Sequence, residues 1–206
     1  MSENIERLRR FVQDFGALLN ETDNEARILD IGGKLLEDLV RHDDWLPDEY
    51  AQPDPERYRQ YLLHCDSLER FSVVAFVWGP RQKTPIHNHT IWGLVGVLRG
   101  AEIAQSYEWR DGKLVSRQID ILHPGQVEAV SPTIGDVHKV GNAEPDSVSI
   151  SIHVYGANIG AVERSTFDEA GKAKPFISGY ANTTLPNLWD RSRPTEPATP
   201  LRPVLH

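Results

Sequence analysis

The 206-residue sequence contains only one cysteine, Cys65. A single cysteine cannot form an intramolecular disulfide or a zinc–thiolate cluster. Its scarcity fits a reducing compartment and leaves histidine and carboxylate side chains as the expected metal ligands. The eight histidines are therefore the residues among which a metal site is expected.

The sequence also lacks an excess of basic residues and any long apolar run. Its 22 Lys and Arg are outnumbered by 30 Asp and Glu, which gives a formal charge of −8. Nucleic acids and anionic membranes attract basic surfaces, so neither is an expected partner. The sequence has no apolar stretch of about 18 residues, and its charged beginning has no signal-peptide core. These features predict a cytoplasmic protein and leave its oligomeric state open.

Two kinds of periodicity divide the chain. Apolar residues recur at intervals of three and four over residues 5–19 and 28–40, which predicts two amphipathic helices. A Pro-rich break at residues 45–55 follows, and a short helix is predicted at residues 55–61. From Phe71 the period changes to two, which is typical of strands.

The β-rich part consists of short runs separated by turn signals. These runs are residues 71–79, 91–100, 101–110, 113–122 and 146–156. Asp111-Gly112 is a hairpin signal between the third and fourth runs. Many short strands with such turns predict a mainly β fold, a double-sheet sandwich or barrel preceded by α-helices.

The length favours one domain. We expect N-terminal helices over residues 1–57, a barrel over 58–165 and a C-terminal extension over 166–206. Residues 184–206 contain five prolines, so they cannot form a regular helix or a central strand. This last stretch is predicted to run extended over the surface.

Three histidines are candidate metal ligands. His87 and His89 are two residues apart, and in a strand such residues project from one face with Cα atoms about 6.6 Å apart. Two imidazoles at that spacing can bind one ion, and His138, at another predicted strand edge, can complete the set. The alternative is that the histidine pair is simply part of a polar strand face.

A second candidate cluster lies in the last β-rich run. Strict alternation places Ser151, His153 and Tyr155 on one face and apolar residues on the other. If the polar face points into the barrel, the three side chains can form a hydrogen-bond relay that ends in a phenol near the metal. A solvent-facing polar strand is the alternative, and a serine hydrolase is disfavoured because no G-x-S-x-G elbow surrounds the serine.

The segment from Phe71 to Thr90 and the later Gly135-x-x-His138-x-x-x-Asn142 together resemble the two motifs of the cupin superfamily. They resemble most closely its cysteine dioxygenase type thiol dioxygenases, over residues 58–155. The resemblance implies a jelly-roll type double-sheet β-barrel with a metal in its mouth.

In that family a histidine pair and a later histidine bind non-haem iron(II), and a Ser-x-His-x-Tyr strand forms an outer-sphere relay. The resemblance assigns the metal to His87, His89 and His138, and the relay to Ser151, His153 and Tyr155. The glutamate ligand usual in cupins is missing after His89. Three neutral imidazoles leave a divalent ion its full charge and open positions for a thiolate and then a gas ligand, which favours iron(II).

Two departures from the mammalian cysteine dioxygenases bear on the substrate. Gly93 stands where those enzymes have a cysteine that cross-links to the relay tyrosine, so Tyr155 is expected to be unmodified. Gln60 stands where they have an arginine that binds the substrate carboxylate, and glutamine cannot form a charged fork.

This pattern resembles the bacterial 3-mercaptopropionate dioxygenases, which supply an arginine from after the relay strand. Arg164 matches that arginine, and with Gln60 it is expected to hold the carboxylate. On the alternative interpretation, Arg164 is an ordinary surface arginine paired with Glu163 or Asp168.

The sequence thus predicts an iron(II)-dependent thiol dioxygenase whose partners are O₂ and a small carboxylated thiol, 3-mercaptopropionate. The product is a sulfinate, and no reducing cofactor is needed because its formation consumes all the oxidising equivalents of O₂. L-cysteine dioxygenase is the competing prediction within the family. The residues also leave open a metal- or acid-binding cupin without turnover and a three-histidine zinc hydrolase, although a mere binding site has no need of the relay.

Overall fold

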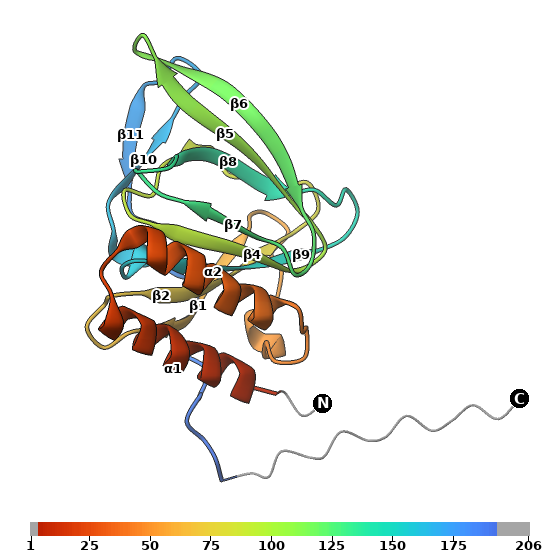
Figure 1. The fold of residues 1–206 in the computed structure, drawn as a ribbon. Coiled ribbons are helices and arrows are strands. Elements are labelled where there is room, and N and C mark those ends of the chain that lie inside the picture. Colours follow the sequence, from red (N-terminus) through yellow and green to blue (C-terminus); the bar gives the residue numbers. More distant parts are fainter. Residues whose placement is uncertain (1–3, 193–206) are drawn as a thin grey trace, which may run out of the picture.

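The computed structural model describes residues 4–192, in which two antiparallel β-sheets face each other and two helices cover the outside of one sheet (Figure 1). The first sheet has the order β1 (Arg59–Cys65), β2 (Ser72–Trp78), β9 (Ser149–Tyr155), β4 (Gly93–Arg99) and β7 (Val127–Val130). The second sheet has the order β11 (Ala173–Phe176), β10 (Arg164–Phe167), β3 (Ile86–His87), β8 (Val137–Asn142), β5 (Glu102–Arg110) and β6 (Lys113–Leu122). The predicted mainly β, double-sheet barrel with N-terminal helices is confirmed.

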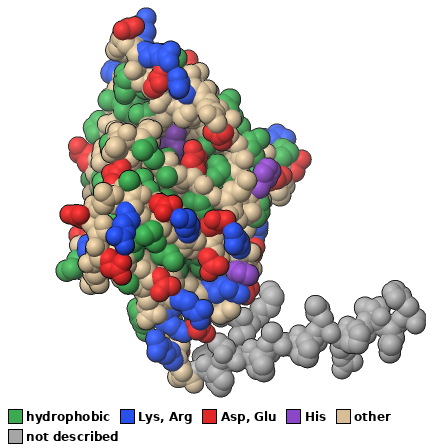
Figure 2. Space-filling model, viewed as in Figure 1, with side chains coloured by type: hydrophobic (Ala, Val, Ile, Leu, Met, Phe, Trp, Pro, Cys, Tyr) green, Lys and Arg blue, Asp and Glu red, His purple; other side chains and the backbone are tan. Residues whose placement is uncertain are grey.

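Helices α1 (Glu6–Glu21) and α2 (Glu25–Val40) match the two predicted amphipathic segments. The Asn24 side chain caps α2 by accepting a hydrogen bond from the backbone N–H of Arg27, which satisfies one of the free donors of its first turn. Their outer faces are polar, and Figure 2 shows acidic and basic side chains interspersed over this side of the molecule. No helix within residues 4–192 is both long and apolar enough to cross a membrane.

The core has two layers. Apolar residues of α1 and α2 pack against the outer face of the first sheet, and a smaller cluster lies between the two sheets. Alternate residues of β2 and β9 divide between these layers: Ile150, Ile152 and Val154 join the helical layer, whereas Tyr155 joins the layer between the sheets. The polar face of β9 therefore points into the barrel.

Glycine lets α2 approach the sheet closely. A Cβ atom on Gly96 of β4 would lie 3.0 Å from Cγ of Leu36, which is fully buried on α2. The absent side chain leaves room for the leucine, so helix and sheet pack without a gap.

The prediction of a short helix at residues 55–61 is wrong. A 3₁₀ turn, η1 (Asp48–Tyr50), lies earlier, and β1 begins at Arg59. The Asp54 carboxylate accepts hydrogen bonds from the backbone N–H groups of Glu56 and Arg57, which favours a turn, and the following residues pair with β2. Tertiary pairing thus overrides the local pattern.

Other boundaries also differ from the expectations. The second sheet continues past residue 165 through β10 and β11, because these strands add to the edge of β3. The hairpin at Asp111-Gly112 is confirmed, and both residues have positive φ angles, 49° and 75°. Most of the predicted Pro-rich tail, residues 193–206, lies outside the described residues.

Leu36→Ala is expected to lower the free energy of unfolding by about 2–5 kcal/mol, because it opens a cavity between α2 and β4. Urea denaturation at an unchanged m-value would measure the loss. Leu68→Ala is the matched control, since the Leu68 side chain is 74% exposed and should cost little. Equal effects of the two substitutions would contradict the packing described here.

Candidate metal centre and adjoining cavity

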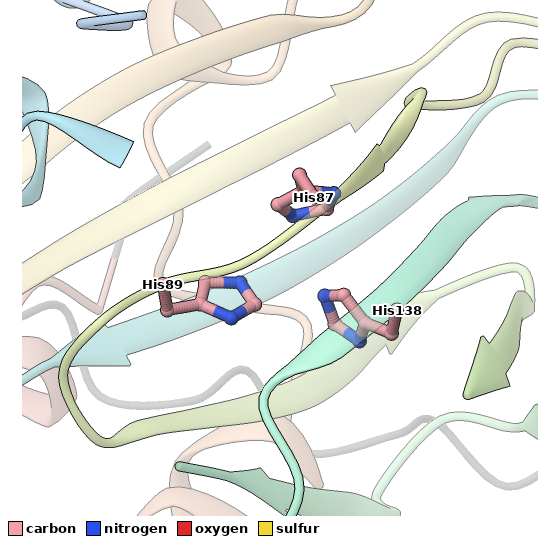
Figure 3. Close-up of side chains that lie close together, drawn as sticks. All are labelled: His87, His89 and His138. Carbon is pink, nitrogen blue, oxygen red and sulfur yellow. The ribbon is translucent and has the colours of Figure 1, made fainter. Parts of the chain in front are cut away.

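Three buried histidines converge between the sheets (Figure 3). His87 ends β3 and pairs directly with His138 of β8, and His89 follows two residues later in the chain. One ring nitrogen of each lies within 4.8 Å of the others. The structure thus brings together the three predicted ligands, although β3 ends at His87 and His89 lies in the loop that follows it.

The hydrogen bonds of these imidazoles leave nitrogens available for a metal. Nδ1 of His87 donates to the carbonyl oxygen of Pro85 at 3.1 Å, so Nε2 is the free nitrogen. Nδ1 of His89 donates to Oδ1 of Asp136 at 3.1 Å, and its Nε2 is buried without a hydrogen-bond partner. Burying an unpaired nitrogen costs free energy, and a bound cation would satisfy it.

Asp136 positions His89 and was not identified from the sequence. Besides the imidazole, its carboxylate accepts hydrogen bonds from the backbone N–H groups of His89, at 2.9 Å, and Thr90, at 3.0 Å. Thr90 has φ of 63°, an unfavourable conformation for a β-branched residue, and these bonds help to hold it. Asp136 lies two residues before His138, but only the folded chain shows that it faces His89.

Burial lowers the pKa of His87 and His138 well below the ordinary value, and it also lowers the pKa of His89. Burial alone would raise the pKa of Asp136, but hydrogen bonds from His89 and Thr90 outweigh it and lower that pKa. The site therefore offers three neutral imidazoles backed by a carboxylate. This donor set fits a divalent metal ion held by nitrogen.

The predicted relay residues form one hydrogen-bonded chain on the inner face of β9. Ser151 Oγ lies 2.9 Å from His153 Nε2, and His153 Nδ1 lies 2.8 Å from the Tyr155 hydroxyl. The Tyr155 ring stacks on His89, with ring centroids 5.5 Å apart. Burial raises the pKa of the phenol, so Tyr155 is protonated at neutral pH.

Gly93 lies directly opposite Tyr155 in the pairing of β4 with β9. A Cβ atom at Gly93 would come within 2.9 Å of the tyrosine ring, so the ring occupies the space that a side chain would need. At this position Tyr155 therefore faces a glycine and not a cysteine. The one cysteine of the sequence, Cys65, is a free thiol on β1.

A cavity of about 330 Å³ adjoins His87 and is lined by the two predicted substrate residues. Its lining includes Gln60, His87, Tyr155 and Arg164. Oε1 of Gln60 is buried without a hydrogen-bond partner. The cavity thus joins the metal centre, the end of the relay and the candidate carboxylate-binding groups.

Arg164 is 5% exposed, so it is not a surface arginine. Its guanidinium lies 4.7 Å above the Phe176 ring, one Nη donates to Ser178 at 2.7 Å, and Nε is buried without a partner. Within residues 4–192 no ion pair joins it to Glu163 or Asp168, the two partners expected of a surface arginine here. Burial lowers its pKa, yet a guanidinium remains charged, so the cavity contains a cation without a paired anion.

Comparisons with known proteins find a matching family and several similar solved structures. The sequence model of the family described as cysteine dioxygenase type I matches residues 35–169. Similar solved structures include a Thermus thermophilus protein, 21% identical over 53% of this chain and 92% of that chain, with a TM-score of 0.43. A Klebsiella pneumoniae protein with a double-stranded β-helix domain is 19% identical over 64% of this chain and 87% of that chain, with a TM-score of 0.43. A Desulfitobacterium hafniense cupin superfamily protein is 11% identical over 52% of this chain and 84% of that chain, with a TM-score of 0.40.

Substitution of any one of His87, His89 or His138 by alanine is expected to abolish stoichiometric metal retention, because two protein ligands hold the ion too weakly. Asp136→Asn should weaken metal affinity by about 10–100-fold, since it loosens the orientation of His89. Elemental analysis and chelator competition would measure both effects. His123→Ala, at an exposed histidine, is the control, and a variant that keeps full metal content would remove that residue from the site.

Proposed function

Because the chain belongs to the cysteine dioxygenase type I family, we propose that it is an iron(II)-dependent thiol dioxygenase acting on 3-mercaptopropionate. The reaction adds both atoms of O₂ to the sulfur and gives the sulfinate. The observation that carries the proposal of a carboxylated thiol is Arg164, a buried guanidinium without an acidic partner in the cavity beside His87. A substrate carboxylate would supply the missing anion.

An iron(II) ion held by His87, His89 and His138 would supply Lewis-acid and redox chemistry to the thiol and O₂. The side chains of the protein would bind and orient the substrate. Arg164 binds and orients the carboxylate through a charge-assisted hydrogen-bonded pair, and Gln60 offers a further polar contact from β1. Tyr155, held by His153 and Ser151, provides a phenol at the cavity wall that can hydrogen-bond to the reacting thiol.

The charges in the cavity favour 3-mercaptopropionate over L-cysteine. Arg164 and Lys174 both line it, and no Asp or Glu is among its described lining residues. An ammonium group would find no carboxylate there, so cysteine would have to bind as the neutral amine at a cost in free energy. A thiol with a carboxylate and no amine avoids that cost.

Tyr155→Phe is expected to retain metal and to lower kcat by about 10–1000-fold, since the lost hydroxyl acts mainly in the transition state. Oxygen consumption with 3-mercaptopropionate would give the rate. Tyr61→Phe is the matched control, because the Tyr61 hydroxyl bonds to the backbone oxygen of Gln52, outside the cavity lining. Unchanged turnover in Tyr155→Phe would make the relay a structural feature only.

Arg164→Ala should lower kcat/KM for 3-mercaptopropionate by about 10–150-fold, which corresponds to about 1.5–3 kcal/mol for a charge-assisted hydrogen-bonded pair. Any activity on 2-aminoethanethiol, which has no carboxylate, should be nearly unchanged. Arg164→Lys should recover part of the loss, because lysine keeps the charge without the planar fork. Equal losses on both thiols would contradict carboxylate binding by Arg164, and a wild-type preference for L-cysteine would replace this substrate by cysteine.

A further inference from the structure

The hydrogen-bonded chain does not end at Ser151. Ser151 Oγ donates to Oε2 of Glu102 at 2.6 Å, and Glu102 lies on β5 of the opposite sheet. Glu102 is only 1% exposed, and its second oxygen, Oε1, has no hydrogen-bond partner. A continuous line of hydrogen bonds therefore runs from Tyr155 at the cavity wall to a buried carboxylate inside the barrel.

The number of hydrogens on each group fixes the direction of this chain. A carboxylate has no hydrogen to donate, so Ser151 must give its only hydrogen to Glu102. The serine oxygen then accepts two hydrogen bonds, from Trp78 Nε1 at 3.1 Å and from His153 Nε2 at 2.9 Å. The Nδ1 atom of a neutral His153 is then an acceptor, so the Tyr155 hydroxyl donates to it and points away from the cavity.

One proton entering at Tyr155 would reverse every bond in this chain. The tyrosine oxygen takes the proton and passes its own hydrogen to Nδ1 of His153, Nε2 passes its hydrogen to Ser151, and the serine passes its hydrogen to Glu102. Each group then holds as many hydrogens as before, except Glu102, which becomes a neutral carboxylic acid. The Tyr155 hydroxyl now points into the cavity as a donor.

We propose that Glu102 is the acceptor of the proton that the substrate thiol loses when it binds, an inference that rests on the proposed function. The S–H bond breaks, its electron pair stays on sulfur, and the proton enters the chain at Tyr155 and ends on Glu102. No electron is gained or lost in this step. The negative charge that appears on the thiolate replaces the one that Glu102 loses, so loss of the thiol proton leaves the net charge of the site unchanged and avoids the cost of a further buried anion.

The charged neighbours of Glu102 are consistent with this role. Nε2 of His153 on β9 lies 3.7 Å from Oε2 of Glu102. On β8, the residue paired with Glu102 is the uncharged Asn142. Burial, followed by the charges of Asp120 on β6 and of Glu102 itself, raises the pKa of Glu128 on β7 to about 7. A proton on Glu102 would reduce the repulsion among these carboxylates.

The test counts protons when metal-loaded protein binds 3-mercaptopropionate without oxygen at pH 7, where the free thiol is protonated. Titration calorimetry in buffers of different ionisation enthalpy gives the number of protons released. The wild type should release almost none, and Glu102→Gln should release about one proton per bound thiol, because its amide still accepts from Ser151 but cannot take a proton. Infrared spectra of the wild type, but not of Glu102→Gln, should gain the C=O band of a buried carboxylic acid.

Two further variants provide a second way to interrupt the hydrogen-bonded chain and a control. Ser151→Ala interrupts the chain before Glu102 and should release a proton as Glu102→Gln does, which keeps the test valid if the glutamine variant folds poorly. Glu128→Gln removes a neighbouring carboxylate and leaves the hydrogen-bonded chain intact, so it should release far less than one proton, although the loss of its charge makes Glu102 a slightly weaker acceptor.

The outcomes separate the two proposals. Equal proton release by the wild type and Glu102→Gln, with saturable thiol binding in both, would overturn the role of Glu102 and leave the thiol dioxygenase proposal standing. Release of a proton by Glu128→Gln as well would also overturn it, because the effect would then follow the total acidity of the barrel. Failure of the wild type to bind the thiol at all would overturn the proposed function itself.

Discussion

Strand β9 is buried on both of its faces, so every polar side chain on it must find its partner inside the barrel. Its apolar face packs under α1 and α2, and its polar face meets the second sheet. The hydrogen bond from Ser151 to Glu102 across the interior, and the one that Ser151 accepts from Trp78 of the neighbouring β2, meet this requirement. The hydrogen-bonded chain that ends at Tyr155 is thus a condition for burying β9, and on the proposed function it also brings a phenol to the cavity.

The two sheets contribute different parts of the site. The first sheet supplies the relay and Gln60, and the second supplies His87, His138 and Arg164. The site lies where the sheets face each other, and the pairing of two strands far apart in sequence positions the ligands. The close packing of α2 on Gly96 supports the first sheet from outside, so the relay is held by a strand with little freedom to move.

Periodicity predicted the two helices and most of the long strands, and alternation predicted that Ser151, His153 and Tyr155 share a face. These are local patterns, which one segment reveals by itself. Asp136 and Glu102 escaped notice because each acts across the barrel, and only register between distant strands shows its partner. The two-residue strand β3 and the edge strands β10 and β11 are likewise products of pairing, too short for a pattern of their own.

The pairing of β10 with β3 also fixes the distance between Arg164 and the candidate metal ligands. Thr166 lies opposite His87, and just beyond β3 the backbone N–H of Asn88 donates to the carbonyl oxygen of Ser165, whose own N–H donates to the Asn88 side chain. Arg164 therefore lies beside the histidines at a spacing that two backbones determine, with no mobile loop between them. On the proposed function, this backbone spacing sets the distance between the positions of the sulfur and the carboxylate, so a homologue one methylene longer or shorter should fit less well, with kcat/KM lower by about 10–200-fold.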